Sequence, residues 1–316
     1  MRTEAAPPRL PRRAVHGVLL LDKPVGLTSQ QALTRAKRML RAEKAGHTGT
    51  LDPLADGLLP LCFGAATKFA QASLDADKSY RATLCLGQTR VGGDREGEVL
   101  RERPVAFEEA ALRAALEAFT GTLHQVPPMH SALKHQGRAL YDYARAGIEV
   151  PRQARTVTIF ALELVQWSGE HLVLDVRCSK GTYVRTLAED LGERLGCGAH
   201  LAGLRRTASG ALRVEDAITL DALDSLDEAG RQARLLSADA LLAGWPEVRL
   251  AHEEAARFLS GLRRRLPRPD APSVRVYGPE PRAFLGSAHI TAGELIADRL
   301  LSPLEVQALL AESPRP

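Results

Sequence analysis

Asp52 is the residue whose surroundings most strongly suggest chemistry, because it lies in the loop Gly46-His-Thr-Gly-Thr-Leu-Asp-Pro-Leu-Ala-Asp-Gly57. Glycines at positions 46, 49 and 57 give this loop backbone freedom, whereas Pro53 fixes one backbone angle beside Asp52. Such a loop can hold one carboxylate in a defined place, as a catalytic nucleophile requires. It is equally typical of an ordinary turn, since Asp-Pro is common in turns. The loop alone leaves both interpretations open.

A wider pattern is carried by five segments of the chain. The longest is Gly46–Lys68, and the others are Leu21-Asp-Lys-Pro-Val-Gly-Leu-Thr-Ser29, Lys78-Ser-Tyr80, Cys178-Ser-Lys-Gly-Thr-Tyr-Val-Arg-Thr-Leu187 and Gly198-Ala-His-Leu-Ala-Gly-Leu-Arg-Arg-Thr207. In this order they closely resemble the motifs of TruB-type tRNA pseudouridine(55) synthases, and the longest segment resembles the active-site stretch of that family. The resemblance covers roughly residues 15 to 215.

The resemblance implies an isomerase that converts the uridine at position 55, in the T arm (TΨC loop) of tRNA, to pseudouridine. The N1 glycosidic bond breaks, the uracil rotates, and the base rejoins the ribose through C5. The family uses a single aspartate nucleophile at the position of Asp52 and needs no cofactor and no metal. Whether the carboxylate attacks C1′ or C6, or works through a glycal, is left open by the sequence.

Two further residues complete the catalytic set that the resemblance implies. A carboxylate in a dry pocket tends to take up a proton unless a nearby cation favours its charged form. Arg185 matches the family's cation, although it could instead pair with Glu189 one helical turn later, a contact worth about 0.2 to 0.5 kcal/mol. Tyr80 matches the active-site tyrosine that lies against the uracil and is proposed as the base in the final proton removal. It could also be a half-buried strand residue.

Access to the target uridine requires that the base leave its stack, which costs a few kcal/mol, and a planar side chain can fill the vacated space. By resemblance, His47 has this role in base flipping. Tyr183 and Leu204 match positions that line the uridine pocket, but each could equally be a packing residue. Asp94 matches a residue that helps to orient the region of His47.

Contacts to RNA phosphates require cations, and candidates lie in or beside the matching motifs. They are Lys23, Lys68, Lys134, Lys180, Arg205 and Arg206. A segment at about 124–155 resembles the family's RNA-clasping insertion. The chain departs from the family at His130, where tyrosine is common, and at Val91-Gly-Gly-Asp94, where a Thr- and Asp-rich run is usual. These departures affect RNA contacts and leave the chemistry intact.

The elements that must position these residues follow from the apolar patterning. Buried strands are expected at 17–21, 58–63 and 80–86, and helices after Thr28-Ser29, at 107–119 and at 183–195. Strands at 156–167 and 171–178 predict a hairpin, because only three residues separate them. These elements predict an α/β (α+β) fold, and the family resemblance implies that its sheet is mixed, largely antiparallel and of the pseudouridine synthase type.

Three parts of the chain are expected. Residues 1–14 are basic and Pro-rich and predict a flexible tail. The family resemblance implies a catalytic domain, placed at residues 15–245 because the patterning changes from Trp245. Residues 246–316 predict a helix at 252–262 followed by short strands. This last part resembles a PUA domain, a small β-rich RNA-binding module. An inert, stabilising appendage is the alternative.

Composition excludes several other classes of protein. The net charge is only +4, and 35 of the 42 basic residues are arginine, which suits phosphate recognition but could also reflect genomic base composition. The four cysteines form no C-x-x-C pair, so neither a zinc site nor a redox motif is indicated, and a reducing cytoplasm fits. Apolar runs are too short for a signal peptide or a membrane span.

Rival functions share part of these features. A tRNA-folding chaperone that does not depend on catalysis would bind the same RNA, and tRNA folding could accompany catalysis. Guide-RNA-dependent pseudouridine synthases share Gly-Thr-Leu-Asp-Pro, but the lead-in Gly46-His-Thr-Gly49 favours the stand-alone type. An aspartate-based phosphotransferase is a poorer fit, because no phosphate-loop motif accompanies Asp52 and Asp56 in this sequence. We therefore expect a monomer that binds the T stem-loop of tRNA without a guide RNA, an obligate protein partner or a membrane.

Overall fold

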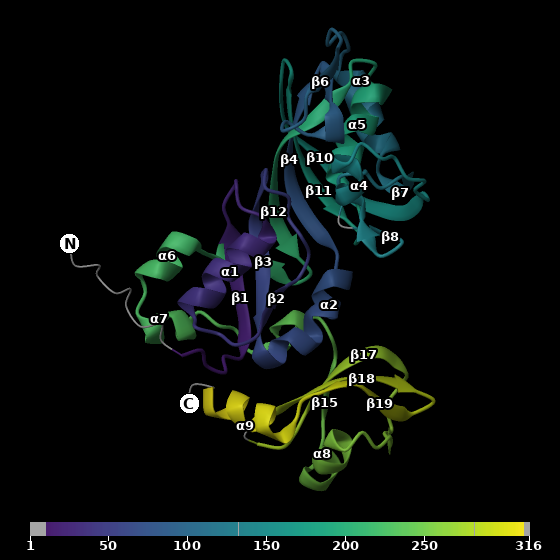
Figure 1. Ribbon diagram of the computed structural model, residues 1–316. Coiled ribbons are helices and arrows are strands. Elements are labelled where there is room, and N and C mark those ends of the chain that lie inside the picture. Colours follow the sequence, from purple (N-terminus) through teal and green to yellow (C-terminus); the bar gives the residue numbers. More distant parts are fainter. Residues whose placement is uncertain (1–10, 132, 281, 313–316) are drawn as a thin grey trace, which may run out of the picture. The chain divides into compact units, whose positions relative to one another are not determined.

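The computed structural model of the protein describes residues 11–131, 133–280 and 282–312, which fall into two compact units (Figure 1). The first unit comprises residues 11–51, 58–75, 210–280 and 282–312, and the second comprises 52–57, 76–131 and 133–209. Of the tail expected at residues 1–14, the first ten residues lie outside the described part. Within the remainder, the Arg13 amide donates to the Arg41 carbonyl at 2.8 Å.

The first unit begins with a small sheet whose strands carry apolar side chains on both faces. Its strands are β14 (Ile218–Thr219), β1 (Gly17–Lys23), β3 (Ala55–Phe63) and β2 (Ala45–His47), hydrogen-bonded in this order. Val18, Leu19 and Leu21 are fully buried, which confirms the strand expected at 17–21. Helix α1 (Ser29–Met39) starts at the expected cap, because the Thr28 hydroxyl accepts from the Gln31 amide.

Short helices surround this sheet within the first unit. They are η1 (Gly64–Phe69), α2 (Ala70–Asp75), η3 (Val214–Asp216), α6 (Leu220–Ser225), α7 (Glu228–Ala233) and η4 (Ala238–Leu242), and the short strand β13 (Leu212–Arg213) precedes η3. Apolar residues of η1 and η4, among them Ala66 and Leu242, share one core with Val18 of β1 and Leu58 of β3. The packing of these helices against β1 and β3 therefore holds β3 in place.

The second unit is built on a sheet of five antiparallel strands, and the first residues of β3 pair with its edge strand in the parallel direction. The strands are β12 (Ala199–Ser209), β4 (Lys78–Leu86), β11 (His171–Cys178), β10 (Arg155–Ser168) and β7 (Gly121–Gln125), in this order. In the parallel edge, Leu204 of β12 pairs with Ala55. The sheet is mixed and largely antiparallel, as expected, and the predicted hairpin is confirmed by the pairing of Ser168 with His171.

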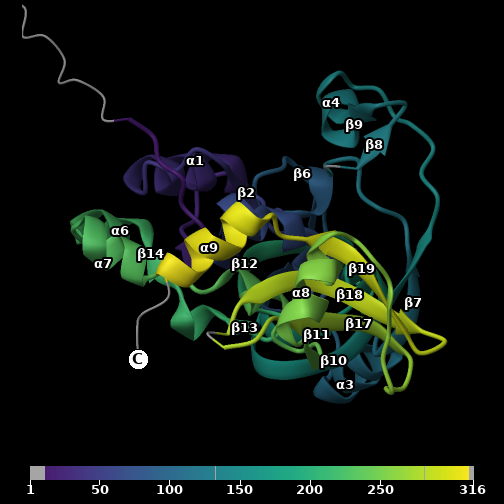
Figure 2. The same ribbon diagram turned by 90° about the horizontal axis from the view of Figure 1, so that it is seen from below.

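Helices α3 (Glu109–Ala118) and α5 (Val184–Arg194) cover one face of this sheet (Figure 1). Leu112 of α3 and Leu187 of α5 are buried in the same core as Leu84 and Leu174 of the sheet. The remaining elements of the unit are β5 (Gln88–Arg90), η2 (Val91–Gly93), β6 (Val99–Glu102), β8 (Lys134–His135), β9 (Arg138–Ala139) and α4 (Leu140–Arg145). Figure 2 shows β8, β9 and α4 standing away from the sheet, as expected of an insertion.

The loop expected at 46–57 is shorter than predicted, because the residues at both of its ends belong to strands. Gly46 and His47 belong to β2, and Ala55 to Gly57 begin β3. At Gly57 the backbone φ is +96°, and a Cβ there would lie 2.4 Å from the Arg206 carbonyl oxygen of β12. Glycine at position 57 therefore allows the start of β3 to pair closely with β12, five residues after Asp52.

The last part of the first unit is a β-rich half-barrel. Its five strands, in sheet order, are β15 (Glu247–Arg249), β17 (Ala271–Tyr277), β18 (Phe284–Thr291), β19 (Glu294–Leu300) and β16 (Arg264–Arg265). Helix α8 (His252–Leu259) covers one face (Figures 1 and 2), and Phe258 is buried among Val274, Leu285 and Ile290. The terminal helix α9 (Pro303–Glu312) was not anticipated from the sequence.

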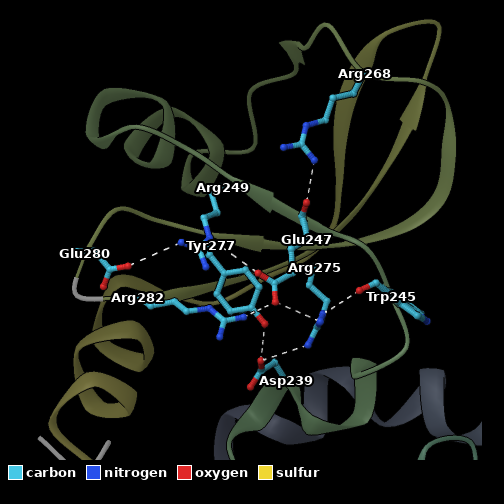
Figure 3. Close-up of polar contacts among 9 residues, drawn as sticks. All are labelled: Asp239, Trp245, Glu247, Arg249, Arg268, Arg275, Tyr277, Glu280 and Arg282. Carbon is cyan, nitrogen blue, oxygen red and sulfur yellow. Dashed lines mark hydrogen bonds and ion pairs between the residues drawn. The ribbon is translucent and has the colours of Figure 1, made fainter. Parts of the chain in front are cut away.

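A polar cluster links this half-barrel to the preceding segment (Figure 3). The Tyr277 hydroxyl hydrogen-bonds the Asp239 carboxylate of η4, and Arg275 Nε donates to the Trp245 carbonyl at 3.0 Å. The Arg282 guanidinium lies 4.2 Å from the centre of the Tyr277 ring. Tyr277 also belongs to the core that contains Leu242, so the half-barrel shares apolar as well as polar contacts with η4.

Candidate active site

Asp52 and Arg185 form an ion pair in the second unit, 133 positions apart in the sequence. Asp52 Oδ2 lies 3.1 Å from Arg185 Nη2. The Asp52 side chain is 42% exposed, whereas that of Arg185 is 7% exposed. Asp52 lies three residues before the first residue of β3, Ala55, and its carbonyl accepts from the Ala55 amide at 3.1 Å. The arrangement presents an accessible carboxylate whose negative charge is stabilised by a buried cation.

Arg185 is the second residue of α5, and its guanidinium contacts three further acceptors. Its guanidinium contacts Asp94 Oδ2 at 3.4 Å, the Gly92 carbonyl at 3.3 Å and the His130 carbonyl at 2.6 Å. The planar fork of arginine suits such a divided set of acceptors. In the described structure it pairs with Asp52 and Asp94 rather than with Glu189, so the helical pair considered from the sequence does not form.

Tyr80 and Arg206 lie opposite each other on β4 and β12. Arg206 is 1% exposed, and its guanidinium hydrogen-bonds the Tyr80 side chain. Burial raises the pKa of Tyr80, Arg206 opposes this rise, and the charge of Asp52 adds to it. Tyr80 therefore lies within electrostatic reach of the carboxylate.

Tyr183 lies at the start of α5, and Leu204 lies on β12, the strand that also carries Arg206. Tyr183 is the residue that precedes α5, and burial raises the pKa of its phenol, with a smaller contribution from Asp52 in the same direction. Leu204 pairs with Ala82 of β4, and it is two residues before Arg206 on β12. The second unit thus brings Asp52, Tyr80, Tyr183, Arg185 and Leu204 into the same region of its sheet.

Gln125, a residue that sequence reasoning missed, fixes the backbone of Tyr183. Its Oε1 accepts from the Tyr183 amide at 3.0 Å, and its Nε2 donates to the Tyr183 carbonyl at 3.3 Å. Gln125 is 3% exposed and is the last residue of β7. Its place where the expected insertion begins was the signal that the sequence offered.

Glu189 is a second residue that the sequence did not single out as functional. Burial raises its pKa to about 7, Asp190 and Asp94 contribute in the same direction, and Arg185 opposes them. Its carboxylate lies against η2, since a Cβ added to Gly93 would be 2.7 Å from it. Glu189 also lines a cavity of about 510 Å³ together with residues of the insertion, including Met129 and Ile148.

The basic residues expected at the RNA backbone differ in their accessibility. Lys134 and Lys180 are exposed, and Arg205 is 39% exposed beside Asp56 at 3.4 Å. Lys68 contacts Glu305 Oε2 at 2.5 Å. Lys23 is fully buried and donates to the carbonyls of Pro24 and Leu27. Arg206 is also buried, so the side chains of Lys23 and Arg206 are both shielded from solvent.

His47 lies in the first unit, on β2, where it pairs with Leu61 of β3. The adjacent Thr48 is fully buried and accepts from the Ser73 hydroxyl at 2.9 Å. No group of three or more His, Cys, Asp or Glu side chains suited to a metal ion occurs among residues 11–131, 133–280 and 282–312. In the same residues no helix combines the length and apolar character of a membrane span.

Comparison with known families matches most of the chain. Residues 37–184 match the TruB family pseudouridylate synthase N-terminal domain, residues 185–243 the tRNA pseudouridylate synthase B C-terminal domain, and residues 246–301 the C-terminal domain of pseudouridine synthase II TruB. Fold and site therefore define an isomerase of the pseudouridine synthase class.

Curated relatives and solved structures narrow this class. The chain is 57% identical over 305 residues to tRNA pseudouridine synthase B of Cupriavidus pinatubonensis, with 93% of this chain and 97% of that protein covered. Against the protein of the same name from Verminephrobacter eiseniae, identity is 56% over 314 residues, covering 97% and 95%. The chain belongs to the TruB family of pseudouridylate synthases.

The fold is also shared with a chain in the crystal structure of a Cbf5-Nop10-Gar1 complex. The TM-score is 0.71 at 25% identity, with 92% of this chain and 86% of that chain covered. The structure of an H/ACA RNP bound to a substrate RNA containing 2′-deoxyuridine gives a TM-score of 0.70 at 24% identity, covering 91% and 86%. The expected sheet and the β-rich C-terminal part agree with this fold.

Proposed function

We propose that this enzyme converts the uridine at position 55 in the T arm of tRNA to pseudouridine, with Asp52 as the nucleophile. The observation that carries the proposal is the pair of an accessible Asp52 and a buried Arg185 at 3.1 Å. The curated relatives, which are named tRNA pseudouridine synthase B, support tRNA as the substrate.

In this proposal Arg185 keeps Asp52 ionised in a site that loses water when the RNA binds. A carboxylate must be charged to act as a nucleophile, and a cation within hydrogen-bond distance favours that form. The second carboxylate on Arg185, that of Asp94, has its Oδ2 3.4 Å from the guanidinium. It would orient Arg185 and leave Asp52 to the substrate.

Tyr80 is assigned the removal of the C5 proton after the base has rejoined the ribose. Tyr183 and Leu204 would form the walls of the uridine pocket, because both lie beside the Tyr80 and Asp52 region of the sheet. His47 would fill the space that the flipped base leaves.

RNA backbone contacts are assigned to the exposed cations Lys134, Lys180 and Arg205, and to Lys68 if its pair with Glu305 opens. The insertion at about 124–155 would clasp the T stem-loop, and residues 246–316 would form a PUA-like RNA-binding domain after the catalytic domain at 15–245. We propose a monomer that needs neither a guide RNA nor a cofactor. We place the enzyme in the reducing cytoplasm, where its four thiols stay reduced.

The decisive experiment is to incubate the purified protein with unmodified tRNA and to map pseudouridine. The wild-type chain should modify position 55 without any added RNA or protein. Asp52→Asn should bind the tRNA and form no product. Asp56→Asn is the matched control, since it removes a carboxylate from the same motif that pairs with Arg205 at 3.4 Å.

Two outcomes would contradict this assignment. Product formation by Asp52→Asn at the wild-type rate would remove the nucleophile and favour a tRNA-folding chaperone. Activity that appears only when a guide RNA is added would place the enzyme with the guide-dependent type.

A further inference from the structure

Arg206 is a charged side chain inside the second unit, with only 1% of its surface exposed. Burying an ionised group costs several kcal/mol unless a partner and hydrogen bonds compensate. Its neighbour Arg205 has the opposite environment, with 39% exposure and a carboxylate at 3.4 Å. Two adjacent arginines on one strand therefore point to different faces, and only one of them is accessible to RNA.

The partner of Arg206 is Tyr80, the residue directly across the sheet. The antiparallel register of β12 and β4 places the two Cα positions opposite each other, and the guanidinium hydrogen-bonds the phenol. Cross-strand neighbours of this kind are close enough for their side chains to interact throughout their length. The contact is therefore built into the sheet and does not depend on a mobile loop.

The other groups that act on the phenol oppose its ionisation. Burial raises the pKa of Tyr80, and the thiol of Cys178 on β11 and the carboxylate of Asp52 raise it further. Arg206 is the group that lowers it. In return, burial lowers the pKa of Arg206, and Tyr80 raises it. A phenol that is buried beside a carboxylate needs such a cation if it is to carry negative charge.

We propose that Arg206 is a positioning residue for the base, which holds the Tyr80 oxygen in place and stabilises its phenolate form. This inference rests on the proposed function, in which Tyr80 removes the proton from C5. In that step the C5–H bond breaks, the proton passes to the phenolate oxygen, and the electron pair returns to the pyrimidine ring. Proton uptake at N1 completes the isomerisation, so that atoms and charge balance.

The first test measures the Tyr80–Arg206 contact without activity. The ultraviolet absorbance of phenolate is titrated in the wild-type chain and in Arg206→Met, and the spectrum of the matching Tyr80→Phe protein is subtracted from each. Methionine is chosen because an apolar side chain of similar length is tolerated where a charge is buried. The pKa of Tyr80 should be higher in Arg206→Met. An unchanged pKa in a folded variant overturns the proposal.

The second test is a double-mutant cycle under single-turnover conditions with tRNA. Each unit by which the pKa of the Tyr80 phenol rises lowers the phenolate fraction about tenfold. Arg206→Met should therefore slow the chemical step by about tenfold or more at neutral pH. The loss should shrink as the pH is raised. In the Tyr80→Phe background, Arg206→Met should have little further effect, because it acts through the missing hydroxyl. The proposal is overturned if the rate losses of Arg206→Met and Tyr80→Phe multiply in the double variant. It is also overturned if the rate loss of Arg206→Met is the same at every pH.

Arg205→Gln provides the matched comparison on the same strand. It should weaken tRNA binding and leave the pKa of Tyr80 unchanged, whereas Arg206→Met should show the reverse pattern. If Arg206→Met does not fold, Arg206→Gln, which also removes the charge, is carried through the same titration and cycle, where a coupling of zero to Tyr80 overturns the proposal. Full activity of Tyr80→Phe would instead refute the base assignment, while the titration would still report on the contact.

Discussion

The amide side chain of Gln125 hydrogen-bonds both backbone groups of Tyr183, with Oε1 at 3.0 Å from the nitrogen and Nε2 at 3.3 Å from the oxygen. They fix the backbone of the residue that immediately precedes α5, at a helix start that has no side-chain cap. Because Arg185 follows two residues later, Gln125 sets the position from which the guanidinium reaches Asp52. The end of β7 is thereby connected to the proposed catalytic pair.

Gln125→Ala should therefore lower kcat more than it raises KM, by roughly tenfold. It should also destabilise the protein by about 1–2 kcal/mol, because the Tyr183 amide loses its partner in a buried place. Gln166→Ala is the matched control, since Gln166 is an exposed glutamine of β10 in the same sheet. Thermal unfolding and single-turnover kinetics give the two readouts. Equal kcat values for Gln125→Ala and wild type would show that α5 is positioned without this contact.

Arg185→Lys tests whether charge alone suffices beside Asp52. The guanidinium divides its donors among two carboxylates and two carbonyls, and an ammonium on a flexible stem cannot reproduce that fork. We expect the single-turnover rate to fall about 100-fold, as for loss of a group that acts in the transition state, with little change in tRNA affinity. A rate near wild type would mean that a point charge is enough.

Glu189 should make stability depend on pH. Its folded pKa of about 7 lies above its ordinary value of 4.5, so the folded chain binds more protons between these values, and stability falls as the pH rises through this window. Glu189→Gln removes the ionisation. It should be more stable than wild type at pH 8 by about 1–2 kcal/mol, after allowance for solvent screening, and the difference should vanish below about pH 4.5.

Glu193 provides the contrast on the same helix. Its pair with Arg103 lowers its pKa, so its contribution to stability is present above its ordinary pKa and is lost as the pH falls. Glu193→Gln should therefore lower stability at neutral pH, opposite in sign to Glu189→Gln. Denaturant unfolding at several pH values decides this, and a pH-independent difference for Glu189→Gln would contradict the burial of its carboxylate.

The C-terminal part should contribute phosphate contacts if it binds RNA. Truncation near Pro246 is a poor test, because Tyr277 and Phe284 share a core with Leu242. The double substitution Arg249→Gln, Arg263→Gln keeps that core and removes two charges that are 62% and 68% exposed. If both reach phosphates, tRNA affinity should fall and the salt slope should flatten by about 1 to 2. An identical slope would favour a stabilising appendage.

Local patterning determined much of the fold. The buried run at 17–21 became β1, the Thr28 cap started α1, and the short separation between two apolar strands produced the β10–β11 hairpin. These features depend on neighbours in the chain, which a sequence displays directly. The motifs around Asp52, Tyr80 and Arg185 also named the proposed catalytic set, and the structure brings these three residues into one region.

Tertiary structure decided which charges are buried. Arg205 and Arg206 are identical and adjacent, and Lys23, like Lys180, lies within a family motif, so the sequence gives no reason to separate the buried cations from the exposed ones. The register of β12 against β4 turns Arg206 inward to Tyr80 and leaves Arg205 outside. Gln125 and Glu189 acquire their contacts in the same way, from strands and turns distant in the sequence. Burial depends on what packs over a residue, and only the assembled sheet fixes that.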